Sequence, residues 1–363
     1  MSSLPPPSIV PIEAPFSIIR KTIRSLVRNR RLFKAANSST RISSVNWPGI
    51  EKISGNYFVS SDKGIFAIID KHAWQLTDLD TFGIAVRGGE LFAATSTDDF
   101  SSISKCVFPE KIAAGKTLTF GEIFRTAINK SGRIHQIAFY GETLGATLTS
   151  ANSIIFLDRE SGVVLSECAP FRDAFGEIIR GDHNHINSLS QSGDCLLFCA
   201  YRAGATGMIG VVHENRVKGY PARNRGAHDI SLSGDMLYYS DTFGGRGKEC
   251  GFLMANNSPV DKEFFEKPPG YAIRGFSQTG DELILGHSHK GPRAKRFDGN
   301  GALFRLVNGK VQQTISTPFA QVYDIVRADG KHFEKTSAFT TWQAINQHLE
   351  TVLGPAIYER ELK

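Results

Sequence analysis

The chain of 363 residues contains no long apolar run. Its hydrophobic stretches cover only a handful of residues, as at 153–157, whereas a helix that crosses a bilayer needs roughly 20. The sequence therefore predicts no membrane-spanning helix. Hydrophobic residues still make up 41% of the chain and charged residues 21%, a composition that is typical of a globular protein and excludes a disordered or collagen-like one.

Cysteine is sparse and follows no pattern. The five cysteines form neither a CxxC pair nor a Cys/His zinc motif, and they stand at Cys106, Cys168, Cys195, Cys199 and Cys250. An odd number of scattered thiols excludes a disulfide scaffold and favours a reducing compartment. We therefore expect a cytoplasmic protein.

Positive charge is concentrated near the start of the chain. Lys and Arg number 42 against 36 Asp and Glu, for a net charge of +6. After a proline-rich arm over residues 1–15, apolar residues recur every three to four positions between Phe16 and Phe33, with six basic residues among them. This pattern predicts a basic amphipathic helix. We favour a helix that docks on the main domain. The alternatives are association with an anionic membrane surface, and a role in nucleic-acid binding or targeting. We expect no specific nucleic-acid binding.

Helical periodicity is nearly absent from the middle of the chain. From about residue 45 to residue 335, short runs rich in Ile, Val, Phe, Leu and Tyr alternate with Gly, Asn, Asp and Ser turns, as in β-strands. Near the end, Trp342, Ile345, Leu349 and Val352 return to helical spacing before Gly354. We therefore assign 1–44 to an arm with a basic helix, 45–335 to a β domain, and 336–363 to a helix packed on that domain.

A repeat organises the β domain. Six times, a first strand is followed by a glycine turn and a second apolar strand, and the turn glycines stand 41 to 53 residues apart, at Gly88, Gly141, Gly193, Gly234, Gly280 and Gly330. A period of about 40 to 50 residues of strand pattern is typical of a four-stranded propeller blade. The sequence thus predicts an all-β, six-bladed β-propeller, in which the strands of 53–70 complete the first blade or its closure.

The first strand of each propeller blade lines the central channel, so equivalent residues form a ring at one depth. In the repeat register this ring consists of Phe82, His135, His185, His228, Arg274 and Tyr323. Only ten His occur in 363 residues, so three His in consecutive blades are unlikely to coincide by chance. We therefore expect the ring to be functional.

Two chemistries fit this ring. The neutral imidazoles of His135, His185 and His228 suit one divalent transition metal (Zn, Mn or Fe) with an open position for substrate or water. Alternatively, the imidazoles, Arg274 and the Tyr323 hydroxyl form a cationic pocket for a carboxylate, sulfate or phosphate, with one His as general base or nucleophile. Arg274 favours the second, because a guanidinium repels a bare cation; a metal bridged to Arg274 by an anionic substrate satisfies both.

Two resemblances follow from these motifs. His185-Ile186-Asn187, His228-Asp229, residues 269–276 and Tyr323-Asp324 resemble, in that order, a bacterial propeller family of unassigned function with H-x-N, H-x-x-x, PG-x-x-RG and YD signatures. More distantly, His185-Ile186-Asn187-Ser188, Arg202 and His228-Asp229 are similar to motifs of arylsulfotransferases, six-bladed propellers in which a channel His carries the sulfuryl group. The second resemblance implies His228 as nucleophile, His185 and Arg202 as holders of the transferred group, and His135 as completing the pocket.

We therefore expect an enzyme that acts on an anionic small molecule or saccharide. Its chemistry is either His-centred group transfer or metal-assisted lyase or hydrolase chemistry. The expected catalytic residues are His228, His185, His135 and Tyr323, and the expected substrate-binding residues are Arg274, Arg202, Asn187 and His287. Propellers also serve as non-catalytic modules, so the alternative is a binding module for an anionic ligand or a protein partner.

Overall fold

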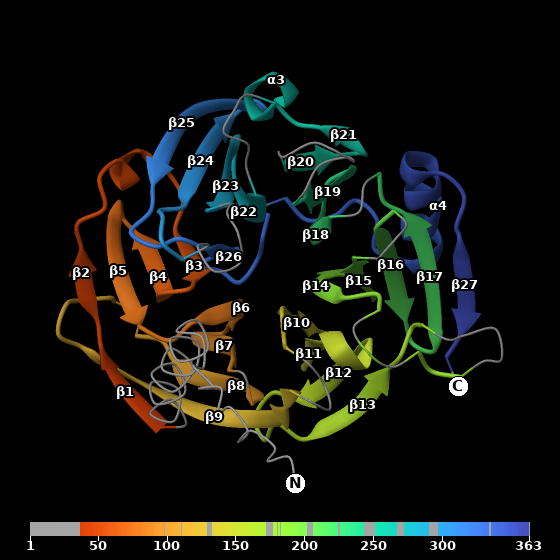
Figure 1. The fold of residues 1–363 in the computed structure, drawn as a ribbon, viewed down its shortest axis with the longest axis horizontal. Coiled ribbons are helices and arrows are strands. Elements are labelled where there is room, and N and C mark those ends of the chain that lie inside the picture. Colours follow the sequence, from red (N-terminus) through yellow and green to blue (C-terminus); the bar gives the residue numbers. More distant parts are fainter. Residues whose placement is uncertain are drawn as a thin grey trace, which may run out of the picture.

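The computed structural model describes residues 37–97, 99–109, 111–128, 133–171, 177–179, 181, 183–201, 206–223, 226–242, 251–266, 272–289, 297–333 and 335–362. The expected basic helix at Phe16–Phe33 lies outside these residues. Six antiparallel sheets surround a central axis and follow one another around it in sequence order (Figure 1). The prediction of a six-bladed β-propeller is confirmed.

Each blade is named here by its innermost strand. The β6 blade contains β6 (Thr81–Arg87), β7 (Glu90–Ser96), β8 (Phe100–Val107) and β9 (Thr117–Ala127), with β1 (Asn37–Arg41) outside β9. The β10 blade contains β10 (Ile137–Tyr140), β11 (Thr143–Leu148), β12 (Ser153–Asp158) and β13 (Val164–Cys168). The β14 blade contains β14 (Ile186–Ser192), β15 (Cys195–Ala200), β16 (Met208–His213) and β17 (Arg216–Pro221), with β27 (Tyr358–Glu361) outside β17.

The other three blades complete the ring. The β18 blade contains β18 (Ala227–Ser233), β19 (Met236–Asp241), β20 (Phe252–Ala255) and β21 (Ser258–Pro259). The β22 blade contains β22 (Ala272–Thr279), β23 (Glu282–Ser288), β24 (Ala302–Val307) and β25 (Lys310–Ser316). The β26 blade contains β26 (Val322–Arg327), β3 (Tyr57–Ser61), β4 (Gly64–Ile69) and β5 (His72–Thr77), with β2 (Ser43–Val45) outside β5. Short helical turns are η1 (Ile50–Lys52), η2 (Thr149–Ala151) and α3 (Lys262–Phe265).

The ring closes within the β26 blade. Its inner strand comes from the end of the β domain and pairs with β3 from the start, so that Ile325 lies opposite Val59. The strands expected at residues 53–70 thus close the last blade. The strands β1 and β2 extend the sheets to residues before 45, and they cover the outer edges of two different blades.

Apolar side chains fill the spaces between neighbouring blades. Phe92 of the β6 blade packs edge-on against Phe139 of the β10 blade, with ring centroids 5.4 Å apart. Each of the apolar clusters combines residues of at least two blades. The apolar side chains are thus buried between the blades, and the polar residues at the starts of the inner strands lie at the channel.

The C-terminal segment runs along the turns of three inner hairpins, at the end of the inner strands away from their starts. The carbonyls of His332, Thr336 and Thr340 accept hydrogen bonds from the backbone N of Gln278 (2.8 Å), Gly234 (3.0 Å) and Asp194 (3.0 Å), which belong to successive inner hairpins. The helix α4 (Trp342–Leu353) follows, and its Ile345 and Leu349 are buried against the β domain. The predicted C-terminal helix is confirmed, beside β16 and β17 (Figure 1).

No helix among the described residues is long and apolar enough to cross a membrane.

Gly83 lets the starts of the inner strands β6 and β10 approach each other. These starts surround one end of the channel, which we call the channel mouth. A Cβ at Gly83 would lie 2.7 Å from Cα of Gln136, whereas a Cβ at Gly121 of β9 would meet no atom within 4 Å. We expect Gly83→Ala to lower the free energy of unfolding by about 1–3 kcal/mol through overpacking. Gly121→Ala is the matched control, with a change of at most about 1 kcal/mol. Urea unfolding measures both, and equal values for the two variants would contradict this packing.

Candidate functional site

Irregular backbone marks the starts of the inner strands. The pairing register shifts in the first residues of β6, β14, β18, β22 and β26. A β-bulge places an extra residue in one strand and re-aims its side chains. These bulges lie at the residues predicted to form the channel ring.

The predicted ring residues are neighbours around the axis. The Tyr323 and Phe82 rings stack with centroids 4.7 Å apart, and Phe82 lies 5.7 Å from His135. The His135 centroid is 4.8 Å from that of His185, which is 6.5 Å from that of His228. These five side-chain rings form one continuous row. Each comes from a different inner strand, or from the residues just before it. His185 is thus the common neighbour of His135 and His228.

The position of His185 differs from the predicted register by two residues. Counted back from the equivalent hairpin pairs, Ser233–Met236 and Ser192–Cys195, the residue of β14 that corresponds to His228 is Asn187. His185 precedes the paired strand and has a left-handed backbone, with φ +51°. Its ring still lies between those of His135 and His228, because this turn of the backbone brings it back to the row.

Burial keeps two of the imidazoles neutral. Burial, with the adjacent His185 and the charges of Arg274 and Arg133, lowers the pKa of His135 well below its usual value. Burial and Arg274 likewise lower the pKa of His228. At neutral pH the uncharged imidazoles of His135 and His228 therefore lie near cationic guanidinium groups, an arrangement that favours an anionic ligand.

Asn187 selects the tautomer of His228. Nδ2 of Asn187 donates to the carbonyl of Ala227 (3.1 Å), and Oδ1 accepts from Ser188, so the amide orientation is determined by its partners. The same Nδ2 lies 3.3 Å from Nε2 of His228. Because Nδ2 can only donate, Nε2 accepts and the proton of the neutral imidazole is on Nδ1. His228 therefore offers an N–H donor rather than a free lone pair.

Two buried carboxyl groups support the ring from the bulges. Oδ2 of Asp229 accepts from Ser240 (2.7 Å) and from the backbone N of Gly275 (2.9 Å) in the next inner strand. Oδ2 of Asp324 accepts from Gln136 Nε2 (2.7 Å) and from the backbone N of Ile84 (3.2 Å).

Burial raises the pKa of both carboxyl groups. It raises that of Asp324 to about 6, an effect that the charge of His332 opposes and that of Asp229 reinforces. Asp324 thus titrates close to neutral pH, far above the usual range of an Asp.

The other predicted site residues are placed as follows. Asn187 lies at the ring through His228. His287 is half-buried, and its ring lies near that of Phe304 in the same blade, with centroids 5.9 Å apart. Arg202 lies outside the described residues.

Four contributors were not predicted as site residues. Arg133 lies over the Phe82 ring at 5.9 Å, and its charge helps to lower the pKa of His135. It stands two residues before His135 and belongs to no motif of the repeat, so the sequence did not identify it. Asp229, Asp324 and Gln136 each directly follow a ring residue. A polar residue thus recurs directly after a ring residue in three blades, and this recurrence could have identified them from the sequence.

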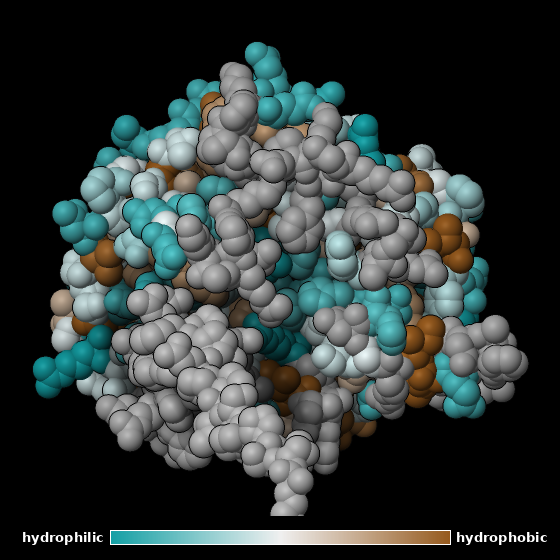
Figure 2. Space-filling model, in the orientation of Figure 1, coloured by the Kyte–Doolittle hydropathy of each residue, from teal (hydrophilic) through white to brown (hydrophobic). Residues whose placement is uncertain are grey.

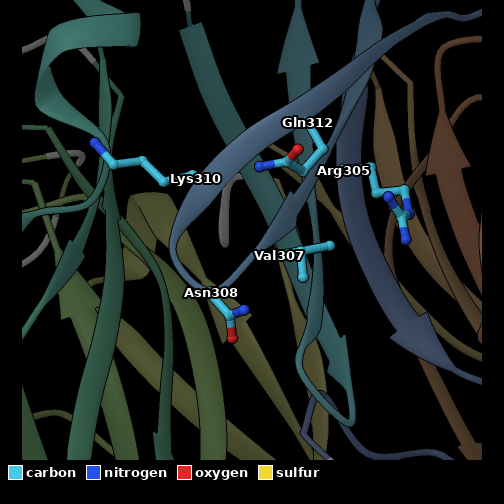
Figure 3. A pocket seen from close by; sticks show the side chains of 5 residues that line it. All are labelled: Arg305, Val307, Asn308, Lys310 and Gln312. Atoms are coloured by element: carbon cyan, nitrogen blue, oxygen red, sulfur yellow. The ribbon is translucent and has the colours of Figure 1, made fainter.

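The surface also has a depression away from the channel. It has a volume of about 490 Å³ and is lined by Arg305, Val307, Asn308, Lys310 and Gln312 of the β24–β25 hairpin. Figure 3 shows Arg305 and Lys310 pointing away from each other, and they pair with Glu282 and Asp261. Hydrophilic residues instead gather at the centre of the face in Figure 2. The channel mouth is therefore the candidate site.

Comparison with known proteins supports the fold alone. No family model and no curated protein matches the chain. A chain of a nidogen/laminin complex is similar with a TM-score of 0.53 and 10% identity, covering 77% of this chain and 100% of that one. A Bacteroides caccae protein of unknown function has a TM-score of 0.49 at 10% identity, over 75% and 98% of the two chains. A Streptomyces coelicolor aldose sugar dehydrogenase with bound PQQ has 0.38 at 16%, over 69% and 92%.

Asp324 predicts a pH dependence of stability. Its pKa is about 6 when folded, against 3.8 for an ordinary Asp, so the folded state binds the proton more tightly. Its contribution is present below pH 4 and is lost as the pH rises through 6, by about 3 kcal/mol in total.

The test compares the wild type with Asp324→Asn in urea between pH 4 and pH 7. We expect the stability of the wild type relative to the variant to fall across this range. Asp281→Asn, at an exposed hairpin, controls for an amide substitution as such. Parallel pH profiles for wild type and Asp324→Asn would contradict the raised pKa.

Proposed function

We propose that the channel mouth binds an anionic small molecule or saccharide and that the protein is a His-centred group-transfer enzyme acting on it. The observation that carries this proposal is the row of adjacent imidazoles beside Arg274 and Arg133. Two cations beside buried, neutral imidazoles favour binding of a sulfate, phosphate or carboxylate group.

The ring residues divide into donors and one acceptor. Arg274, Arg133, the Tyr323 hydroxyl and the Nδ1–H of His228 hold the anion and stabilise the charge that develops on it. His135 is neutral, half-buried, and makes no side-chain hydrogen bond among the described residues. We therefore assign the reacting imidazole to His135 rather than to His228, whose Nε2 lone pair is held by Asn187.

The reaction follows from this division. The lone pair of His135 attacks the sulfur or phosphorus of the bound group, a bond from nitrogen to that atom forms, and the bond to the leaving oxygen breaks. The Nδ1–H of His228 donates a hydrogen bond to the leaving oxygen, which takes its proton from solvent. Water or an acceptor hydroxyl then takes the group from His135 and loses its own proton.

A metal-assisted lyase or hydrolase is the second candidate. Neighbouring imidazoles have centroids 4.8 and 6.5 Å apart, but among the described residues the three do not form a cluster of ligand atoms as close as that of Asp194, Cys195 and His213. The two guanidinium groups count against a bare cation at this place, and only the Nδ1 side of His228 would be available to it. Elemental analysis of the wild type and of His228→Ala distinguishes the two candidates. A metal-assisted enzyme should lose one equivalent of metal in the variant, whereas group transfer predicts the same metal content in both proteins.

Arg274 is the variant that tests anion binding. We expect sulfate and inorganic phosphate, compared with chloride at matched ionic strength, to raise the Tm of the wild type. Arg274→Ala should weaken this binding by at least ~10-fold, because it removes a charge-assisted hydrogen bond. Arg125→Ala, exposed on β9, is the matched control. Equal anion binding by wild type and Arg274→Ala would refute an anion site at the mouth.

His135 is the variant that tests catalysis. Hydrolysis of aryl sulfate and aryl phosphate esters should fall at least ~100-fold in His135→Ala, and mass spectrometry should find the transferred group on the wild type alone. His72→Ala, exposed at the start of β5, is the control. Anion binding that depends on Arg274, without turnover of any ester, would support the alternative, a non-catalytic binding module.

A further inference from the structure

Strands β15 and β16 bring three ligand-type side chains together at the end of the β14 blade. Cys195 begins β15 and His213 ends β16, and the pairing of Leu196 with Val212 places these two residues opposite each other. Asp194 lies in the turn before Cys195. The inner strand β14 separates this turn from His185, and its seven residues span roughly 20 Å. The cluster is therefore distinct from the channel mouth.

We propose that Asp194, Cys195 and His213 form a zinc-binding site. Their donor atoms lie within 4.8 Å of one another. Sγ of Cys195 is 3.1 Å from Oδ1 of Asp194, and Nδ1 of His213 is 3.9 Å from the same oxygen. Ligand atoms on tetrahedral zinc stand about 3.5 Å apart, so shifts of about 1 Å bring all three onto one ion.

The surroundings of His213 suit this coordination. Nδ1–H of His213 donates to the carbonyl of Asp194 (2.8 Å), and Nε2 lies 3.8 Å from Oε1 of Glu214. When Nδ1 coordinates an ion, the proton resides on Nε2, where the Glu214 carboxylate accepts it. A carboxylate behind the far nitrogen of the imidazole is the usual support of a zinc-bound His.

The donor set selects zinc among common cations. Sulfur, nitrogen and oxygen donors together suit Zn²⁺, whereas Ca²⁺ and Mg²⁺ prefer oxygen alone. Burial and Asp194 raise the pKa of the Cys195 thiol, and the charge of Arg216 opposes this. A dication displaces the thiol proton and is balanced by the thiolate and Asp194.

The site holds the turn against which the C-terminal segment docks. The backbone N of Asp194 donates to the carbonyl of Thr340 (3.0 Å), and Tyr140 donates to the carbonyl of Asp194 (2.9 Å). The Trp342 ring, at the start of α4, lies 6.2 Å from that of His213. Bound zinc would therefore stabilise the attachment of α4 and serve a structural role.

Cobalt reports on the site because a cobalt–thiolate bond gives a charge-transfer band in the near ultraviolet. The full-length protein, treated with a chelator, is titrated with Co²⁺ and then with Zn²⁺. We expect about one equivalent of Co²⁺ with this band, and a rise in Tm with Zn²⁺. Both effects should persist in Cys199→Ser, a buried thiol on the same strand, and vanish in Cys195→Ser. His213→Ala should weaken binding at least ~10-fold.

Each other outcome overturns the proposal. A charge-transfer band that persists in Cys195→Ser assigns the ion to another thiol. Retention of Co²⁺ without the band assigns it to the imidazoles of the channel mouth, which contain no thiolate. Failure of the wild type to bind either ion refutes any zinc site. If Cys195→Ser does not fold, His213→Ala and Asp194→Asn carry the test.

Discussion

Polar side chains at the bulges of the inner strands join three pairs of neighbouring blades in this propeller. Asn187 donates to the carbonyl of Ala227, and Asp229 and Asp324 accept from the backbone N of Gly275 and Ile84. A bulge takes backbone groups out of the ladder, and buried groups of this kind need a partner. The side chain of one blade supplies that partner for the following blade, so the irregular strand entrances are stable and the ring residues can converge at the axis.

This arrangement also determines the electrostatics of the channel mouth. Carboxyl groups lie beneath the ring with raised pKa values, and Arg274 and Arg133 lie beside imidazoles whose pKa values are lowered. Both carboxyl groups accept hydrogen bonds from the backbone, and the charge of Arg274 opposes the raised pKa of Asp229. The guanidinium groups thus lie near neutral imidazole nitrogen atoms, a combination that suits the anionic substrate and the reacting imidazole that we propose.

The repeat carried most of the information about the fold. Turn glycines such as Gly141 and Gly234 recur with every blade because each inner hairpin needs a left-handed residue, so the number of blades was predictable. The outer strands β1, β2 and β27 were not, because an edge strand is chosen by the sheet that it meets. The ring residues were predictable, but His185 stands two residues before the position equivalent to His228, because the strand entrances are irregular in ways that leave no mark in the sequence. The tautomer of His228 depends on Asn187 and Ala227, which only the packing of two blades brings together.

The most direct test of the account is the protonation state of the imidazoles, measured by their ¹⁵N chemical shifts as a function of pH. We predict that His135 and His228 stay neutral at pH values well below the usual pKa of His, that His228 carries its proton on Nδ1, and that Arg274→Ala raises both pKa values. Ordinary titration of both residues near pH 6.5, unchanged in Arg274→Ala, would contradict the account.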